Sequence, residues 1–105
     1  MKQTNLDHLN GKPVLQKIVK KVLPILKEAG VKRASIFGSF VRGENKRGSD
    51  VDFLIDTPKN MGLFDFVGLQ IKMEEALKKK VDLGDYSALK KQIRNQVLSE
   101  QVRIL

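Results

Sequence analysis

The chain has 105 residues, which is the length of one compact domain. Twenty lysine and arginine residues against twelve aspartate and glutamate residues leave a net charge of +8, which favours anionic ligands or partners. Because the sequence has no cysteine and one histidine, it excludes disulfides, a thiol nucleophile, thiolate zinc sites and histidine-rich metal centres.

Residues 1–12 are polar and irregular, which predicts a loose N-terminal arm before a single domain over residues 13–105. From Pro13 to Leu26 the apolar residues recur with helical spacing, and Gly30 is a helix stop.

Strand and helix patterns then alternate: strands are predicted over residues 31–37, 50–55 and 81–83, and a helix over residues 63–79. Asp85 is a candidate N-cap for a last helix, in which Leu89, Ile93 and Val97 recur every four residues. This order predicts a small α/β (α+β) domain, in which helices pack on a mixed β-sheet of three to four strands.

No stretch comes near the ~18 apolar residues that a membrane span needs, and the first residues show no apolar core of a secretory signal. The sequence therefore predicts a cytoplasmic protein without a membrane partner. Aromatic residues make up 6% of the chain and form no stacking platform, which argues against direct nucleic-acid binding.

A candidate phosphate site follows the first predicted strand. Gly38 permits a tight bend and close approach of a ligand, and Ser39 opens one helical turn whose amides and hydroxyl suit an anion. Arg42 and Arg47, with Lys46, add positive charge nearby. The same residues also fit an ordinary turn with a capping serine and solvated loop cations.

A candidate metal site begins the second predicted strand. Asp50 and Asp52 are two residues apart and so share one side of a strand, where they repel each other unless a cation joins them. Such oxygen ligands suit Mg²⁺ together with substrate phosphates. Asp82 is a third carboxylate if its strand lies beside the second, although it also fits an ion pair with one of the lysines at 78–80. Together the two sites predict nucleotidyl transfer.

This arrangement resembles a known signature. The Gly-Ser pair at 38–39, ten intervening residues and the Asp-Val-Asp triplet at 50–52 match the DNA polymerase beta-like nucleotidyltransferase superfamily. The stretch FGSFVRGENKRGSDVDFLID is similar to its minimal nucleotidyltransferase (MNT) branch, and the likeness continues through residues 81–83 and the last helix. Val41 and Gly48 depart from the usual pattern but remove no expected ligand.

The resemblance implies the polymerase beta-like nucleotidyltransferase fold, with ATP held against Gly38 and Ser39. It also implies two Mg²⁺ ions held by Asp50, Asp52 and Asp82, the last of which can also accept the proton of the attacking hydroxyl. Many stand-alone MNT proteins are antitoxins that transfer AMP to a tyrosine of a HEPN-type toxin, so such a toxin is the implied partner. The open alternatives are transfer to a small molecule or an RNA end, and a non-catalytic antitoxin that acts by binding.

Overall fold

The computed structural model describes residues 6–105, and residues 1–5 lie outside the described part of the chain. Its elements in chain order are η1 (Asp7–Leu9), α1 (Pro13–Glu28), β1 (Ala34–Phe37), α2 (Ser39–Arg42), β2 (Val51–Ile55), α3 (Leu63–Leu77), β3 (Val81–Asp85), η2 (Tyr86–Ala88), α4 (Lys91–Glu100) and β4 (Val102–Arg103). The strands form one sheet in the order β3-β2-β1-β4, in which β2 and β3 are parallel and the other neighbours antiparallel. The predicted α/β class with a mixed sheet of three to four strands is therefore confirmed, and the sheet has four strands.

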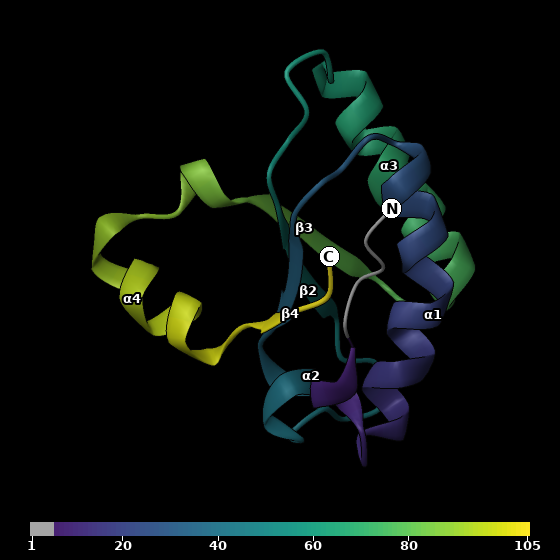
Figure 1. Cartoon of the computed structure of the whole chain (residues 1–105), viewed down its shortest axis with the longest axis vertical. Helices are drawn as coiled ribbons and strands as arrows, with labels where there is room; N and C mark the ends of the chain where they lie inside the picture. Colours follow the sequence, from purple (N-terminus) through teal and green to yellow (C-terminus); the bar gives the residue numbers. More distant parts are fainter. Residues whose placement is uncertain (1–5) are drawn as a thin grey trace.

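One face of the sheet is covered by α1 and α3, which lie side by side in Figure 1. Apolar side chains from both helices bury alternate residues of the strands, as the helical spacing predicted for both segments requires. The largest fully buried strand side chains on this face are Ile36, Phe53 and Ile55. Because side chains alternate along a strand, Ser35 and Asp52 point to the other face, where the polar groups gather.

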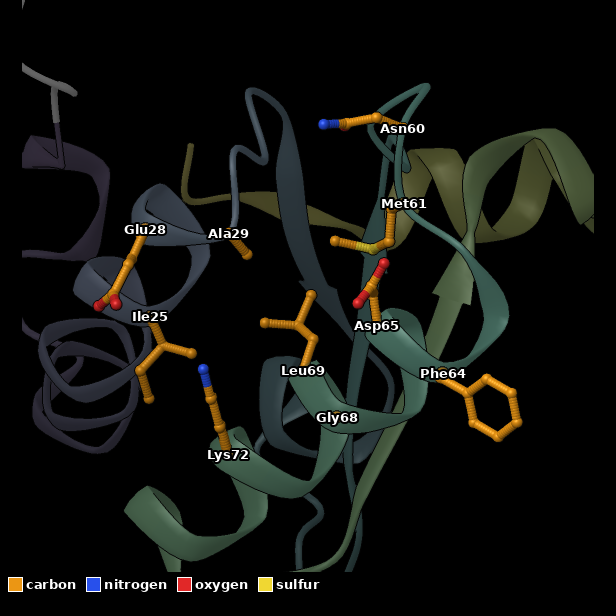
Figure 2. Close-up of a pocket in the computed structure, with 10 residues that line it drawn as sticks. All are labelled: Ile25, Glu28, Ala29, Asn60, Met61, Phe64, Asp65, Gly68, Leu69 and Lys72. Atoms are coloured by element: carbon orange, nitrogen blue, oxygen red, sulfur yellow. The ribbon is translucent and has the colours of Figure 1, made fainter.

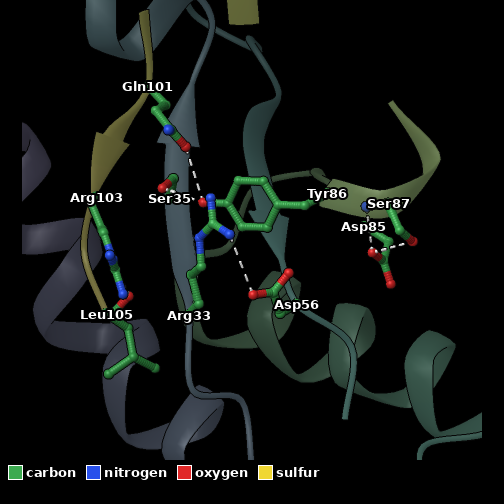
Figure 3. Close-up of polar contacts among 9 residues, drawn as sticks. All are labelled: Arg33, Ser35, Asp56, Asp85, Tyr86, Ser87, Gln101, Arg103 and Leu105. Atoms are coloured by element: carbon green, nitrogen blue, oxygen red, sulfur yellow. Dashed lines mark hydrogen bonds and ion pairs between the residues drawn. The ribbon is translucent and has the colours of Figure 1, made fainter. Parts of the chain in front are cut away.

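Tyr86 lies over the second face of the sheet (Figure 3). The Tyr86 hydroxyl donates to Oγ of the buried Ser35 at 2.5 Å and lies 3.0 Å from Oε1 of Gln101. Arg33 stacks on the Tyr86 ring, with its guanidinium carbon 4.0 Å from the ring centre, and forms an ion pair with Asp56. These contacts attach η2 and the start of β4 to the middle of the sheet.

The last helix differs from the sequence-based expectation. Asp85 accepts the backbone N–H of Ser87 and so caps η2, whereas α4 begins only at Lys91. None of the α4 residues is buried, and Ile93 is 45% exposed. In Figure 1, α4 lies on the side of the sheet opposite α1 and α3 and stands away from it. The expected last helix is therefore present, but Asp85 is not its N-cap and none of its residues enters the core.

Residues 6–12 contact the rest of the chain. Part of the predicted arm, residues 1–5, lies outside the described residues. Of the rest, η1 places Leu9 in the core, and Nε2 of His8 lies 2.7 Å from the carbonyl oxygen of Arg103. Across residues 6–105, no helix is long and apolar enough to cross a membrane.

Candidate active site

The site is organised by one row of residues that crosses three strands. Phe37 in β1 pairs with Asp52 in β2, and Asp52 pairs with Asp82 in β3. Residues paired across neighbouring strands project from the same face of a sheet, so both carboxylates lie on the face away from α1 and α3. Asp50 immediately precedes β2 and is exposed. The structure therefore brings together the predicted carboxylates of two strands.

The Gly-Ser turn directly adjoins this row. Gly38 follows Phe37, has φ of 83° and ψ of −154°, and stands at the N-cap of α2. A Cβ added to Gly38 would overlap Oδ2 of Asp52 and lie 3.2 Å from its Cγ. Only glycine satisfies both the positive φ and this close approach. The predicted phosphate-binding turn and the predicted metal ligand are thus in contact.

The surroundings of Asp52 oppose its ionisation. Burial raises the pKa of Asp52 to about 6, with further contributions from the charges of Asp82 and Asp50 and an opposing one from Arg42. Within residues 6–105, neither Asp50, Asp52 nor Asp82 forms an ion pair. The alternative in which Asp82 pairs with a lysine of residues 78–80 is therefore not found.

The residues present fit a hard divalent cation. Their carboxylate oxygens are the ligands that Mg²⁺ prefers, and a cation would offset both the burial and the neighbouring negative charges that raise the pKa of Asp52. In the described part of the chain, no three carboxylate or imidazole groups already converge closely enough to form a metal cage. Substrate phosphate oxygens would have to complete the coordination, which is the usual way in which Mg²⁺ is held with few protein ligands.

The predicted phosphate-binding arginines differ in their surroundings. Arg42, at the end of α2, donates through Nε to Glu44 at 2.6 Å and through NH1 to Glu100 at 3.3 Å. The Glu44 hydrogen bond and the two glutamate charges raise the pKa of Arg42, so it stays cationic. Arg47 lies exposed in the loop between α2 and β2. The same loop is closed by mutual hydrogen bonds between residues 46 and 49.

Three charged residues that sequence analysis left without a functional role lie beside the site. Glu44 and Glu100 contact Arg42, and Nζ of Lys79 lies 5.7 Å from the centre of the Phe40 ring in α2. Glu44 is two residues from Arg42 in the sequence, so its contact with Arg42 could have been predicted from neighbouring residues. Glu100 is 58 residues away, so only the folded chain reveals its contact.

Two other acidic residues are structural. Asp56 pairs with Arg33 at 3.6 Å. Burial opposes ionisation of Asp85, but hydrogen bonds from Thr57 and Ser87 outweigh it and lower the pKa of Asp85. Both residues therefore hold the loops after β2 and β3.

A cavity of about 390 Å³ lies between α1, α3 and the loop before α3 (Figure 2). Ile25, Met61 and Leu69 form its apolar floor, while Phe64 points away from it. This cavity lies on the α1 and α3 side of the sheet and contains none of the predicted site residues. It is therefore separate from Asp50, Asp52 and Asp82.

Known proteins share sequence and fold with this chain. Residues 19–104 match the family model of the nucleotidyltransferase domain. A protein of Methanocaldococcus jannaschii, provisionally named a protein adenylyltransferase, is 41% identical over 91 residues, covering 87% of this chain and 98% of that relative. The protein adenylyltransferase MntA of Thermococcus cleftensis is 43% identical over 75 residues, covering 71% of this chain and 76% of its own.

Solved structures show the same fold. One, described as a minimal nucleotidyltransferase, aligns with a TM-score of 0.75 and 31% identity over 86% of this chain and 92% of its own. Another, a toxin–antitoxin complex with AMP-PNP, contains a chain that aligns with a TM-score of 0.72 and 22% identity, covering 83% of this chain and 72% of that one.

Proposed function

Because this chain belongs to the nucleotidyltransferase family, we propose that it transfers AMP from ATP to a hydroxyl group of a partner protein. The observation that carries the proposal is the contact between Gly38, at a phosphate-binding turn, and Asp52, which stands beside Asp82. Phosphate-binding backbone and carboxylate ligands thus adjoin, as a metal-assisted displacement at the α-phosphate requires.

In this reaction, different residues of the chain would bind the phosphates, hold the metal and accept the proton. The α2 amides and the Ser39 hydroxyl bind the β- and γ-phosphates, with Arg42 and Arg47 supplying positive charge. Asp50, Asp52 and Asp82 would hold Mg²⁺, which when bound neutralises phosphate charge and acidifies the attacking hydroxyl. Asp82, which is exposed, would accept the hydroxyl proton.

The bond changes balance without any further reactant. The acceptor oxygen forms a bond to the α-phosphorus, and the bond from the α-phosphorus to the oxygen bridging to the β-phosphorus breaks. Pyrophosphate leaves with that electron pair, and the acceptor's proton passes to a carboxylate. Catalysis then consists of positioning and charge stabilisation.

The acceptor is proposed to be a tyrosine of a HEPN-type toxin, which makes this chain the antitoxin of the pair. The relatives named protein adenylyltransferases and the toxin–antitoxin neighbour with AMP-PNP support this assignment. The chain's own single tyrosine, Tyr86, is buried and bonded to Ser35 and Gln101, so it is a poor acceptor in the folded protein. Covalent AMP is therefore expected on another protein.

The test is incubation with Mg²⁺ and ATP labelled at the α-phosphate, with extract of the host cell. A labelled protein band that is absent with Asp52→Asn and with EDTA is expected, and mass spectrometry then locates AMP on tyrosine. Label in RNA or a small molecule would assign a different acceptor. A stable complex with the partner that takes up no label would indicate an antitoxin acting by binding alone.

A further inference from the structure

Arg42 is held from two directions by carboxylates. Its Nε–H group donates to Glu44 in the following loop, and its NH1 group donates to Glu100 at the end of α4. A guanidinium has five N–H donors, so three remain for another acceptor. That number is enough for a bidentate contact with one phosphate group.

The position of Glu100 is determined by the pairing of β4 with β1. Ser35 pairs with Arg103 and Ile36 with Val102 in antiparallel register. β4 begins two residues after Glu100, and its partner Ile36 lies two residues before Gly38, so this pairing brings the end of α4 towards the phosphate-binding turn. The Tyr86 hydroxyl, 3.0 Å from Gln101, holds the same connection from the other side. Glu100 therefore lies beside the turn because the C-terminal strand places it there.

We propose that Glu100 is a positioning residue for Arg42, which it holds over the phosphate-binding turn so that ATP meets a pre-oriented guanidinium. The inference rests on the proposed function, since it assumes that Arg42 binds the triphosphate. A free arginine side chain loses rotational freedom when it is fixed. The two glutamates fix it in advance, so less of that loss falls on nucleotide binding.

The kinetic constants distinguish this positioning role from a general destabilisation of the fold. Glu100→Ala removes the acceptor for NH1, and we expect the KM for ATP to rise about three- to tenfold with kcat nearly unchanged. Glu100→Gln keeps a carbonyl oxygen that accepts the same hydrogen bond, and is expected to restore most of the affinity. In an Arg42→Lys background, Glu100→Ala is expected to have little further effect, because the two residues act as a unit.

Two matched controls separate positioning from loss of structure. Gln101→Ala removes a contact that holds the same connection without touching Arg42, and is expected to leave the KM for ATP unchanged. Glu75→Ala removes an exposed carboxylate of α3 and controls for net charge. Circular dichroism melting is recorded for every variant. A KM effect of Gln101→Ala equal to that of Glu100→Ala would overturn the proposal.

Direct binding of ATP and Mg²⁺ by calorimetry distinguishes the remaining outcomes. Tighter binding by both Glu100 variants would show that Glu100 competes with the phosphates, which contradicts positioning. Equal affinity of wild type and Glu100→Ala would also overturn the inference while leaving the proposed function intact. Failure of the wild type to bind ATP at all would reject both.

Discussion

Asp52 and Asp82 occupy paired positions on the parallel strands β2 and β3, so their carboxylates project side by side from one face of the sheet. Asp52 is half-buried and Asp82 is exposed, although they share one row. Asp52 adjoins the Gly38 turn, whereas Asp82 is open to solvent and, in the proposed reaction, would be accessible to the acceptor.

Replacing Asp82 should impair chemistry without harming the fold. We expect Asp82→Asn to lower kcat by about 10²- to 10³-fold, since it removes a proton acceptor and a metal ligand. Asp85 offers a matched control on the same strand, because its carboxylate bonds Thr57 and Ser87. Asp85→Asn should lower the free energy of unfolding by about 1 kcal/mol and retain kcat. Single-turnover labelling and urea unfolding measure the two effects, and equal kcat for both variants would contradict the assignment.

Asp52 should make the metal-free protein less stable as the pH rises. Its pKa is about 6 in the folded chain against 3.8 in an unperturbed aspartate, so the folded state holds the proton more tightly. The stabilising contribution is therefore full below about pH 4 and is lost as the pH rises through 6. Each pKa unit corresponds to about 1.4 kcal/mol, which solvent screening of this half-buried group reduces.

Asp52→Asn is accordingly expected to stabilise the metal-free protein at pH 8 by about 1 kcal/mol while abolishing transfer. Near pH 4 the two proteins should unfold at the same urea concentration. Glu75→Gln on α3 is the control, and the measurement is urea unfolding in EDTA at both pH values. If Asp52→Asn were less stable than wild type at pH 8, the ionised Asp52 carboxylate would not destabilise the fold.

Glycine at position 38 should be indispensable for activity. Gly38→Ala would combine a φ of 83° with a Cβ that overlaps the Asp52 carboxylate, so we expect transfer to fall at least 100-fold. Gly43 has φ of 72° but no atom within 4 Å of an added Cβ. Gly43→Ala should therefore cost about 1 kcal/mol of stability and leave the site working. Equal effects of Gly38→Ala and Gly43→Ala would indicate that backbone strain, and not the contact with Asp52, makes glycine necessary at position 38.

Tyr86 should contribute to stability rather than to catalysis. Tyr86→Phe removes the hydrogen bonds to Ser35 and Gln101 and leaves the buried Ser35 hydroxyl without that partner. We expect a loss of about 1–2 kcal/mol in the free energy of unfolding, with kcat unchanged. Adding Ser35→Ala should recover part of the loss, because it removes the unpaired hydroxyl. A double variant less stable than Tyr86→Phe alone would argue against this explanation.

The outward position of α4 predicts weak local stability. Ile93→Ala should change the free energy of unfolding by less than about 0.5 kcal/mol, because the side chain is 45% exposed. Leu69→Ala, in the buried face of α3, should cost about 2–5 kcal/mol. Hydrogen exchange should also be faster in α4 than in α3. Protection of α4 equal to that of α3 would indicate that it packs on another surface in solution.

Much of the candidate site could be predicted from the sequence because its signals are local. Gly38 and Ser39 follow an apolar strand, and the two aspartates at 50 and 52 stand at the start of another, so neighbouring residues alone reveal the turn and the ligand pair. The sequence predicted that Asp52 and Asp82 lie side by side only if their strands are neighbours. The parallel β2–β3 register shows that these strands are neighbours.

Other features depend on contacts between distant residues and could not be read from local patterns. The four-residue spacing of Leu89, Ile93 and Val97 predicts a helix but does not say what covers it, and nothing in the described chain buries α4. Strand β4 has two residues, too few to show any periodicity, and it is recognised only by its pairing with β1. Sequence alone therefore predicted the candidate site residues and determined most elements, because backbone preference and side-chain spacing act locally. Only the tertiary structure placed Glu100 on Arg42, because that contact depends on a hydrogen-bonded register between segments far apart in the chain.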